Sequence, residues 1–332
     1  MNLSTTYLGI KLRTPLVPSA SPLSEDFDNI KCMEDAGASA IVFHSLFEEQ
    51  IRADGYEPHR GIRRPRQPYP EALTYFPERA NFRVTLEDYA ERIARAKQST
   101  SIPIIGSLNG STFGGWTMFA REIEQAGADA LELNLYSLPT DPGISAEEIE
   151  TSYLTILTSV IGQVRIPVAV KLSPYFTNLS QFAQRLVKSG AAGLVLFNRF
   201  YQPDIELETR EVVPRVVLST PSAMRLPLRW IAILRGRIGA NLAASGGIHR
   251  ATDALKMLMA GADVTMLCSV LLARGIGHLG TIERELREWM EEHELDSIEQ
   301  LKGCLSQENY PDPSAYERAQ YLRAVSTART AD

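Results

Sequence analysis

A lysine at the end of an apolar run is the first residue in this sequence that could do chemistry. Lys171 follows the apolar residues 167–170. A lysine at the end of a buried strand must meet an anion or change its pKa. We interpret Lys171 as a charge that stabilises a cofactor or an enolate. A Schiff-base aldolase and a lysine that only extends into solvent are the alternatives.

A glycine pair gives a second candidate site. Gly246 and Gly247 follow an apolar run and precede a helical pattern. Glycines let the backbone approach a ligand closely, and N–H groups at a helix start bind phosphate. Enzymes built on an eight-stranded barrel often hold a phosphate between the loops after the seventh and eighth strands. If the glycine pair follows the seventh strand, Cys268 and Ser269, which follow the next apolar run, would be the other half of this site. A plain tight turn is the alternative.

Three asparagines occupy matching places at strand ends. Asn109, Asn134 and Asn198 each close an apolar run. Their donors and acceptors suit a flat heteroaromatic ring with C=O and N–H edges, although any one of them could be a loop cap. The strand ends hold no cluster of Asp and Glu, and the three cysteines lie far apart. The sequence therefore predicts no metal site.

Short apolar runs alternate with amphipathic segments along almost the whole chain, and these elements must position the residues above. We expect strands at 16–20, 40–44, 102–107, 130–135, 168–172, 193–197, 241–245 and 264–268. We expect helices at 25–36, 86–97, 118–126, 146–161, 179–188, 228–234, 251–259 and 279–292. This alternation predicts an α/β fold, a TIM (β/α)8 barrel. A doubly wound open sheet is the alternative, which the lack of a GxGxxG motif after the first strand disfavours.

Three segments depart from this rhythm. Residues 45–85, with a basic cluster at 60–66, and residues 198–225 follow strand ends and are candidate lids or substrate loops. The basic cluster is a solvated loop or a rim that attracts an anionic ligand. A helical stretch at 314–324 lies beyond the barrel. We therefore expect one barrel domain, 1–303, and a C-terminal helical tail, 304–332.

Charge and hydropathy narrow the class of protein. The formal net charge is −6, which argues against binding to nucleic acid or to an anionic membrane. No run reaches the roughly 20 apolar residues of a membrane span, and the N-terminus has no signal-peptide pattern. Three separated cysteines suit a reducing compartment. We expect a cytoplasmic protein.

Four motifs in order carry a family resemblance. They are Pro15-Leu16-Val17…Ala20-Ser21, Glu132-Leu133-Asn134-Leu135, Val170-Lys171-Leu172 and Ser245-Gly246-Gly247-Ile248. Together they resemble the dihydroorotate dehydrogenase family, and its soluble class most closely. The resemblance spans about residues 7–303. It implies an N-terminal β-hairpin at 7–13 that plugs the bottom of the barrel.

The resemblance implies FMN at the top of the barrel, which accepts a hydride at N5 from a dihydropyrimidine such as dihydroorotate. Lys171 would lie near flavin N1 and the C2 carbonyl, and Ser137 would be the catalytic base. Asn198 and Thr140 would contact substrate. The remaining cofactor contacts would come from Ala20, Ser21, His44, Ser45, Asn109 and Asn134 around the ring, and from Gly246, Gly247, Cys268 and Ser269 around the phosphate.

Several positions depart from the family pattern. His44-Ser45 stands where the family has lysine and serine or threonine, and residues 72–74 replace an asparagine that reads the substrate ring. Leu138-Pro139-Thr140 replaces Pro-Asn, and Cys268-Ser269 replaces Gly-Thr. A different substrate, such as dihydrouracil, is therefore an alternative. A flavin-binding partner of a larger redox complex is another.

The resemblance also implies partners. Barrels of this family commonly form homodimers, so we expect a homodimer. The chain has no ferredoxin-like cysteine cluster, so any iron–sulfur or FAD relay would belong to a separate electron-acceptor protein.

Overall fold

The computed structural model describes residues 1–48, 51, 85–110, 112–199, 202–213, 217–318, 320 and 321. The arginine cluster at 60–66 and the replaced asparagine at 72–74 lie outside the described residues. The first insertion was predicted to begin at residue 45. The strand before it continues to Phe47, so the insertion begins after that residue.

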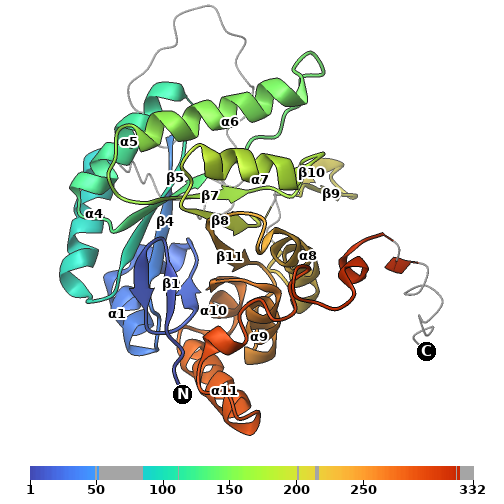
Figure 1. Cartoon of the computed structure of the whole chain (residues 1–332). Coiled ribbons are helices and arrows are strands. Elements are labelled where there is room, and N and C mark those ends of the chain that lie inside the picture. Colours follow the sequence, from blue (N-terminus) through green and yellow to red (C-terminus); the bar gives the residue numbers. More distant parts are fainter. Residues whose placement is uncertain are drawn as a thin grey trace, which may run out of the picture.

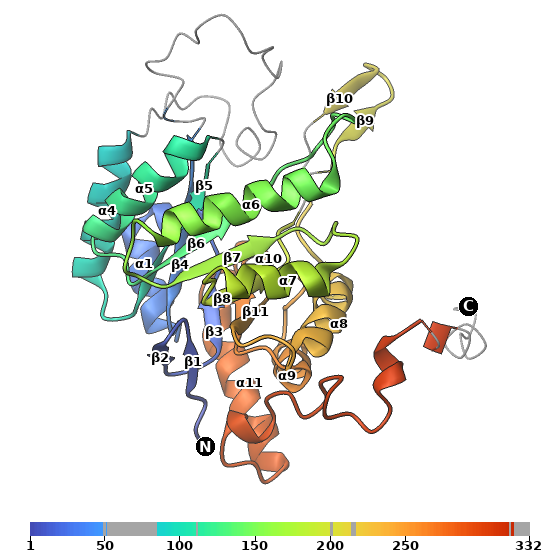
Figure 2. The same cartoon turned by 45° about the horizontal axis from the view of Figure 1, so that its top comes forward.

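Eight parallel strands form the centre of the molecule (Figures 1 and 2). They are β3 (Leu16–Pro18), β4 (Ile41–Phe47), β5 (Ile104–Asn109), β6 (Ala130–Asn134), β7 (Val168–Leu172), β8 (Gly193–Leu196), β11 (Asn241–Ser245) and β12 (Val264–Leu267). Their spatial order is β3-β12-β11-β8-β7-β6-β5-β4. The edge strands meet where Ser39 N donates to Leu16 O at 3.1 Å, so the sheet is nearly closed. The predicted TIM barrel is confirmed.

Helices surround this sheet (Figure 1). They are α1 (Phe27–Asp35), α4 (Leu86–Ser99), α5 (Phe113–Gln125), α6 (Ala146–Ile161), α7 (Leu179–Lys188), α8 (Arg225–Leu234), α9 (Ala251–Ala260), α10 (Ser269–Arg274) and α11 (His278–Glu292). Glycines in the left-handed conformation follow several of these helices, for example Gly37 with a φ of +105° and Gly261 with a φ of +124°.

Two helices begin earlier than the sequence predicted. Helix α5 starts at Phe113 rather than 118, because the Thr112 side chain accepts a hydrogen bond from Gly115 N and caps a glycine-containing first turn. Helix α8 starts at Arg225 rather than 228, because Pro227 is tolerated in a first turn. The six-residue helix α10 was not predicted.

The N-terminal hairpin closes one end of the barrel. Strands β1 (Thr5–Tyr7) and β2 (Ile10–Leu12) pair antiparallel beneath the sheet (Figure 2). Tyr7, Leu8 and Leu12 are buried in one cluster with small residues of the strands. These small residues are Val17, Ala40, Val42, Ala130, Ala169, Val195, Ala243 and Val264. The predicted hairpin plug is confirmed.

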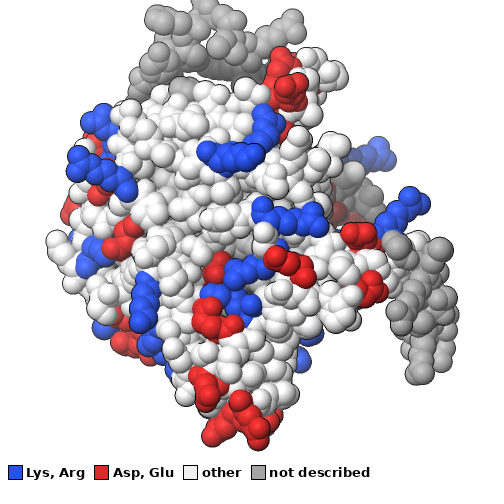
Figure 3. Space-filling model, viewed as in Figure 1, with Lys and Arg blue, Asp and Glu red and all other residues white. Residues whose placement is uncertain are grey.

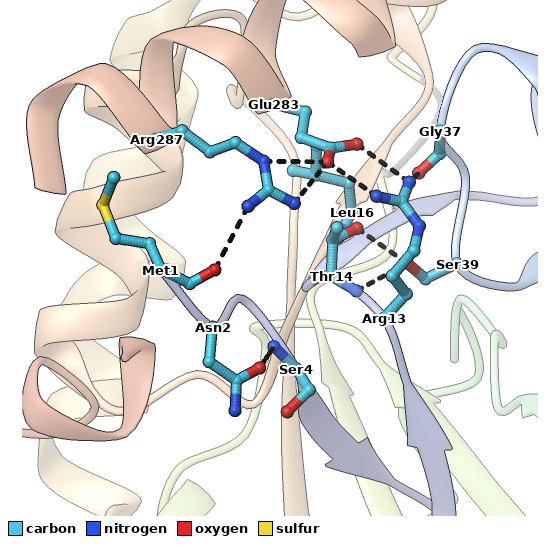
Figure 4. Close-up of polar contacts among 10 residues, drawn as sticks. All are labelled: Met1, Asn2, Ser4, Arg13, Thr14, Leu16, Gly37, Ser39, Glu283 and Arg287. Atoms are coloured by element: carbon cyan, nitrogen blue, oxygen red, sulfur yellow. Dashed lines mark hydrogen bonds and ion pairs between the residues drawn. The ribbon is translucent and has the colours of Figure 1, made fainter. Parts of the chain in front are cut away.

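Ion pairs fasten this end to the last barrel helix (Figure 4). Arg13 donates to both carboxylate oxygens of Glu283, at 2.6 and 2.8 Å, and to Gly37 O at 2.9 Å. Arg287 donates to the same carboxylate at 2.8 Å and to Met1 O at 3.2 Å. One carboxylate thus links the hairpin, α11 and the chain start.

The C-terminal extension packs along the same end. A 3-10 turn η3 (Ile298–Gln300) follows α11, and backbone bonds then join Gly303 N to Leu258 O and Gln307 N to Ala232 O. The predicted helix at 314–324 begins differently, as a 3-10 turn η4 (Pro313–Tyr316) started by Pro313. Residues 322–332 lie outside the described part.

The second insertion carries a hairpin. Strands β9 (Asp204–Glu206) and β10 (Glu211–Val213) pair antiparallel and project from the barrel (Figure 2). The insertion then returns through η2 (Pro221–Met224) to α8.

The surface shows charges of both signs. On the face in Figure 3, Lys and Arg side chains are interspersed with Asp and Glu, with no broad patch of one sign. No helix within the described residues is long and apolar enough to cross a membrane.

Candidate active site

A pocket lies at the carboxyl ends of the strands. Eight of the residues predicted from the sequence line it: Ala20, Ser21, His44, Ser45, Asn109, Asn134, Lys171 and Asn198. They come from β3, β4, β5, β6, β7 and β8 and the loops that follow them, so the parallel barrel brings together side chains up to 178 positions apart. Pro22, Glu25, Phe47 and Arg199 also line the pocket and were not predicted.

A buried ion pair lies at this pocket, and its lysine is the member that lines it. Lys171 Nζ lies 3.2 Å from Glu132 Oε1 and 3.5 Å from Ser19 Oγ. The two charged side chains are only 8% and 1% exposed. Glu132 Oε2 has no hydrogen-bond partner among the described residues. The sequence indicated Glu132 only within a family motif and did not predict it as a site residue. A carboxylate inside an otherwise apolar strand was the feature that could have indicated it.

Hydroxyl and amide groups form a network beside the lysine. Asn134 Nδ2 donates to Ser107 Oγ at 2.9 Å and to Leu108 O at 3.3 Å. Ser45 Oγ and Ser107 Oγ are 2.8 Å apart. Ser107 is fully buried and was missed, although a serine among apolar strand residues was a usable signal. This network fixes the orientation of the Asn134 amide at the pocket.

His44 is a neutral group at the pocket. Burial lowers its pKa to about 3, and the charge of Arg92 acts in the same direction. Its Nδ1 has no partner among the described residues. Tyr89, which was not predicted, donates from its hydroxyl to His44 O at 2.7 Å and to Ser107 O at 3.1 Å. At physiological pH, His44 therefore presents a polar but uncharged side chain to the pocket.

The predicted phosphate-binding residues meet through a third segment. Gly247 N donates to Ser219 Oγ at 3.3 Å, and Ser219 N donates to Ser269 Oγ at 3.0 Å. A Cβ on Gly247 would lie 2.3 Å from Met224 N, so only glycine fits there. Ser219, from the second insertion, was missed because sequence patterns do not show which loop folds over the glycines.

Cys268, next to Ser269, directly follows β12 and is the N-cap residue of α10. Burial raises the pKa of the Cys268 thiol, and the charges of Lys171 and Arg199 oppose that rise. The thiol therefore lies within the electrostatic reach of both cations. Cys268, like the other predicted phosphate-binding residues Gly246, Gly247 and Ser269, is not among the residues that line the pocket.

Ser137 and Thr140 lie on the loop between β6 and α6, and neither is among the residues that line the pocket. Ser137 Oγ is 2.5 Å from the hydroxyl of Tyr153. Tyr153 is buried against Phe176 and Phe182. Burial raises the pKa of Tyr153, so it stays a neutral phenol. The role of Ser137 as a base stays a prediction.

The donor set suits a planar polar ring. The pocket offers the cation of Lys171 and the side chain of His44, and its wall offers the amides and hydroxyls described above. The close approach at Gly246 and Gly247, with φ of +94° and +77°, suits a phosphate. Among the described residues, no group of three or more His, Cys, Asp or Glu could hold a metal ion.

Fold and pocket together define a class: a TIM-barrel enzyme with its site at the carboxyl ends of the strands. Comparison with known proteins gives the family. The family model for dihydroorotate dehydrogenase matches residues 80–290. The chain belongs to the dihydroorotate dehydrogenase family, and it is an oxidoreductase of the dihydroorotate or dihydropyrimidine dehydrogenase type.

Individual relatives agree with this result. The catalytic subunit of dihydroorotate dehydrogenase B (NAD(+)) from Thermoplasma volcanium is 29% identical over 311 residues, covering 91% of this chain and 98% of the relative. A putative dihydroorotate dehydrogenase A (fumarate) from Aeropyrum pernix is 25% identical, covering 91% and 96%. Chloroplastic dihydropyrimidine dehydrogenase (NADP(+)) from Arabidopsis thaliana is 24% identical, covering 91% and 76%.

Proposed function

We propose that this chain binds FMN and oxidises a dihydropyrimidine such as dihydroorotate. The observation that carries the proposal is the buried Lys171, which is paired with Glu132 and lines a pocket together with amides and hydroxyls. When bound, FMN would supply the acceptor for the hydride that leaves the substrate. Every other part of the reaction falls to residues of the chain.

The binding residues divide by chemistry. Lys171 holds a positive charge against the ring, where negative charge would develop. Ser45, Asn109 and Asn134 orient the ring through hydrogen bonds, and Ala20, Ser21 and His44 pack at its edge. Gly246, Gly247, Cys268 and Ser269 hold the phosphate, for which Ser219 would have to give up the N–H of Gly247.

The proton that leaves the substrate needs an acceptor. We assign this role to Ser137, or to a water molecule that it holds. A serine is a weak base, so its hydroxyl needs a relay partner. Tyr153 is hydrogen-bonded to it. The loop 135–145 would bring Ser137 and Thr140 to the pocket, where Asn198 contacts substrate.

The substrate is the open part of this proposal, because several family positions for reading the ring are changed. A site that hydrogen-bonds a polar ring discriminates by factors of roughly 10⁴ or more against a ligand that lacks a partner. Dihydrouracil is the second substrate to be tested.

A partner protein would complete the redox cycle. Two relatives at 29% and 27% identity are named catalytic subunits, which supports a separate electron-acceptor protein for this chain as well. The chain would act as a homodimer in the cytoplasm. If it is inactive alone, it would serve instead as the flavin-binding partner within that complex.

An anaerobic absorbance scan tests the proposal. Purified protein should be yellow, and addition of dihydroorotate or dihydrouracil should bleach it. Bleaching by one compound names the substrate. A yellow protein that neither compound bleaches would contradict the dihydropyrimidine substrate, and a colourless protein that cannot be reconstituted with FMN would contradict the cofactor.

A further inference from the structure

The pocket contains a cation, Arg199, that takes no part in the proposed function. Arg199 directly follows Asn198 after β8 and lines the pocket with it. Its charge also acts on the Cys268 thiol at the end of β12. Arg199 therefore adds a second cation to the lining of the pocket, besides Lys171.

The other charged groups at the pocket are already compensated. Lys171 is paired with Glu132 at 3.2 Å. His44 is neutral at physiological pH, because its pKa is about 3. Glu25 is half-buried; burial raises the pKa of its carboxyl, and the positive charge of Arg92 opposes that rise. Within the described part of the chain, no hydrogen bond or ion pair joins Arg199 to a carboxylate.

An uncompensated guanidinium in the lining of a pocket favours one kind of ligand. Arginine presents a planar fork of N–H donors that matches the two oxygens of a carboxylate. A neutral ring would gain less from this group, because a hydrogen bond to a neutral carbonyl is weaker than one to a carboxylate. The wall of amides and hydroxyls would bind the ring itself equally well with or without a charged substituent.

We propose that Arg199 is a specificity-determining residue, which binds a carboxylate carried by the ring that occupies the pocket. This inference rests on the proposed function and narrows it. Of the two substrates considered above, dihydroorotate carries a ring carboxylate and dihydrouracil does not. Arg199 thus selects an anionic dihydropyrimidine over a neutral one.

Binding of two products tests this without turnover. Orotate and uracil differ only in the carboxylate, and calorimetry with the full-length, FMN-loaded chain gives the affinity for each. The wild type should bind orotate at least tenfold more tightly than uracil. In Arg199→Gln, orotate affinity should fall by roughly tenfold, while uracil affinity stays unchanged.

Two further variants and salt sharpen the test. Arg199→Lys keeps the charge and should retain part of the orotate affinity. Arg229→Gln removes an exposed arginine on α8 outside the pocket and should change neither affinity. Rising ionic strength should weaken orotate binding in the wild type and have little effect in Arg199→Gln.

Three results would overturn the inference. One is equal orotate affinity in the wild type and Arg199→Gln, and another is a flavin-loaded wild type that binds neither product. The third is an Arg199→Gln protein that loses FMN but keeps riboflavin, because the arginine would then serve the cofactor phosphate. The proposed function fails separately: orotate bound through Arg199, with no bleaching by dihydroorotate, would keep the inference and reject the dehydrogenase role.

Discussion

Lys171 and Glu132 pay a desolvation cost that a structural role alone would not require. Two charges removed from water are stabilised only in part by each other. Glu132 also keeps one oxygen without a partner among the described residues. A buried ion pair whose lysine lines a pocket is the arrangement expected where a ligand completes the contacts of that lysine.

Replacement of Lys171 by alanine should therefore affect both binding and stability. Lys171→Ala leaves Glu132 buried without its cation, so the free energy of unfolding should fall by about 3 kcal/mol or more. Flavin content and the rate of bleaching should fall as well. The double variant Lys171→Ala/Glu132→Gln should recover much of the stability but not the flavin. Normal flavin content and bleaching in Lys171→Ala would remove this residue from the site.

The role of Ser137 can be separated from cofactor binding. Ser137→Ala should slow bleaching by about 10²-fold or more, since the proton acceptor is lost, and leave flavin content unchanged. Tyr153→Phe removes only the partner of Ser137 and should have a smaller effect, with a shifted pH profile. Stopped-flow absorbance measures both. A Ser137→Ala protein with the wild-type rate would make this serine a bystander.

His44 makes a prediction about acid stability. The unfolded chain takes up a proton on this histidine near pH 6.5, whereas the folded chain does so only near pH 3. Its contribution is therefore complete above pH 6.5 and is lost as the pH falls towards 3. Between pH 7 and pH 5, the wild type should lose about 2 kcal/mol more than His44→Gln. Equal losses in denaturant titrations at the two pH values would show that His44 is exposed.

At the scale of elements, the glycine loop after β11 depends on a neighbouring turn. Met224, at the end of η2, passes so close to Gly247 that a side chain there would collide with backbone. Gly246 has a similar φ, but a Cβ on it would meet nothing within 4 Å. Gly247 is therefore required by the close backbone of Met224, whereas Gly246 is favoured only by its left-handed backbone conformation.

Alanine substitutions should distinguish them. Gly246→Ala should cost about 1–2 kcal/mol, because the left-handed conformation disfavours a side chain. Gly247→Ala should cost more and should also release flavin, because η2 and Ser219 would be displaced from the loop. Thermal unfolding and bound-flavin measurements test this. Equal effects of the two substitutions would count against the role of η2.

The sequence predicted the helices and strands better than it predicted which side chains contact one another. Apolar runs that alternate with amphipathic segments placed all eight strands to within a few residues, since the period of such a pattern is a local property. Eight site residues met in one pocket because parallel strands deliver their ends to one face. Ser107 and Glu132 left a local signal, a polar residue inside an apolar run, but their partners, like those of Ser219, lie far away in the chain, and no local pattern encodes those contacts.

At the scale of the whole molecule, the two ends of the barrel carry different tasks. The pocket lies at the carboxyl ends, whereas the network of Arg13, Glu283 and Arg287 lies at the opposite end (Figure 4). Burial raises the pKa of Glu283, but the two arginines outweigh it and lower that pKa. Its ion pairs therefore persist at neutral pH.

Disruption of this network should affect stability alone. Glu283→Gln should lower the free energy of unfolding by about 1 kcal/mol, because Arg13 and Arg287 lose their shared partner. Flavin content should be unchanged. Glu288→Gln, in the exposed pair with Arg284 at 3.6 Å, should have no measurable effect. A change in flavin content in Glu283→Gln would show that the two ends are coupled.

The hairpin plug has a consequence for the order of events in turnover. Tyr7, Leu8 and Leu12 close the interior from below, so within the described structure the pocket opens at the carboxyl end of the barrel. A reductant and an oxidant that both enter the pocket must then use one entrance in turn. The first product would have to leave before such an acceptor could approach, which gives ping-pong kinetics with parallel lines in double-reciprocal plots, whereas a partner protein that takes the electrons from outside the pocket would not impose this order.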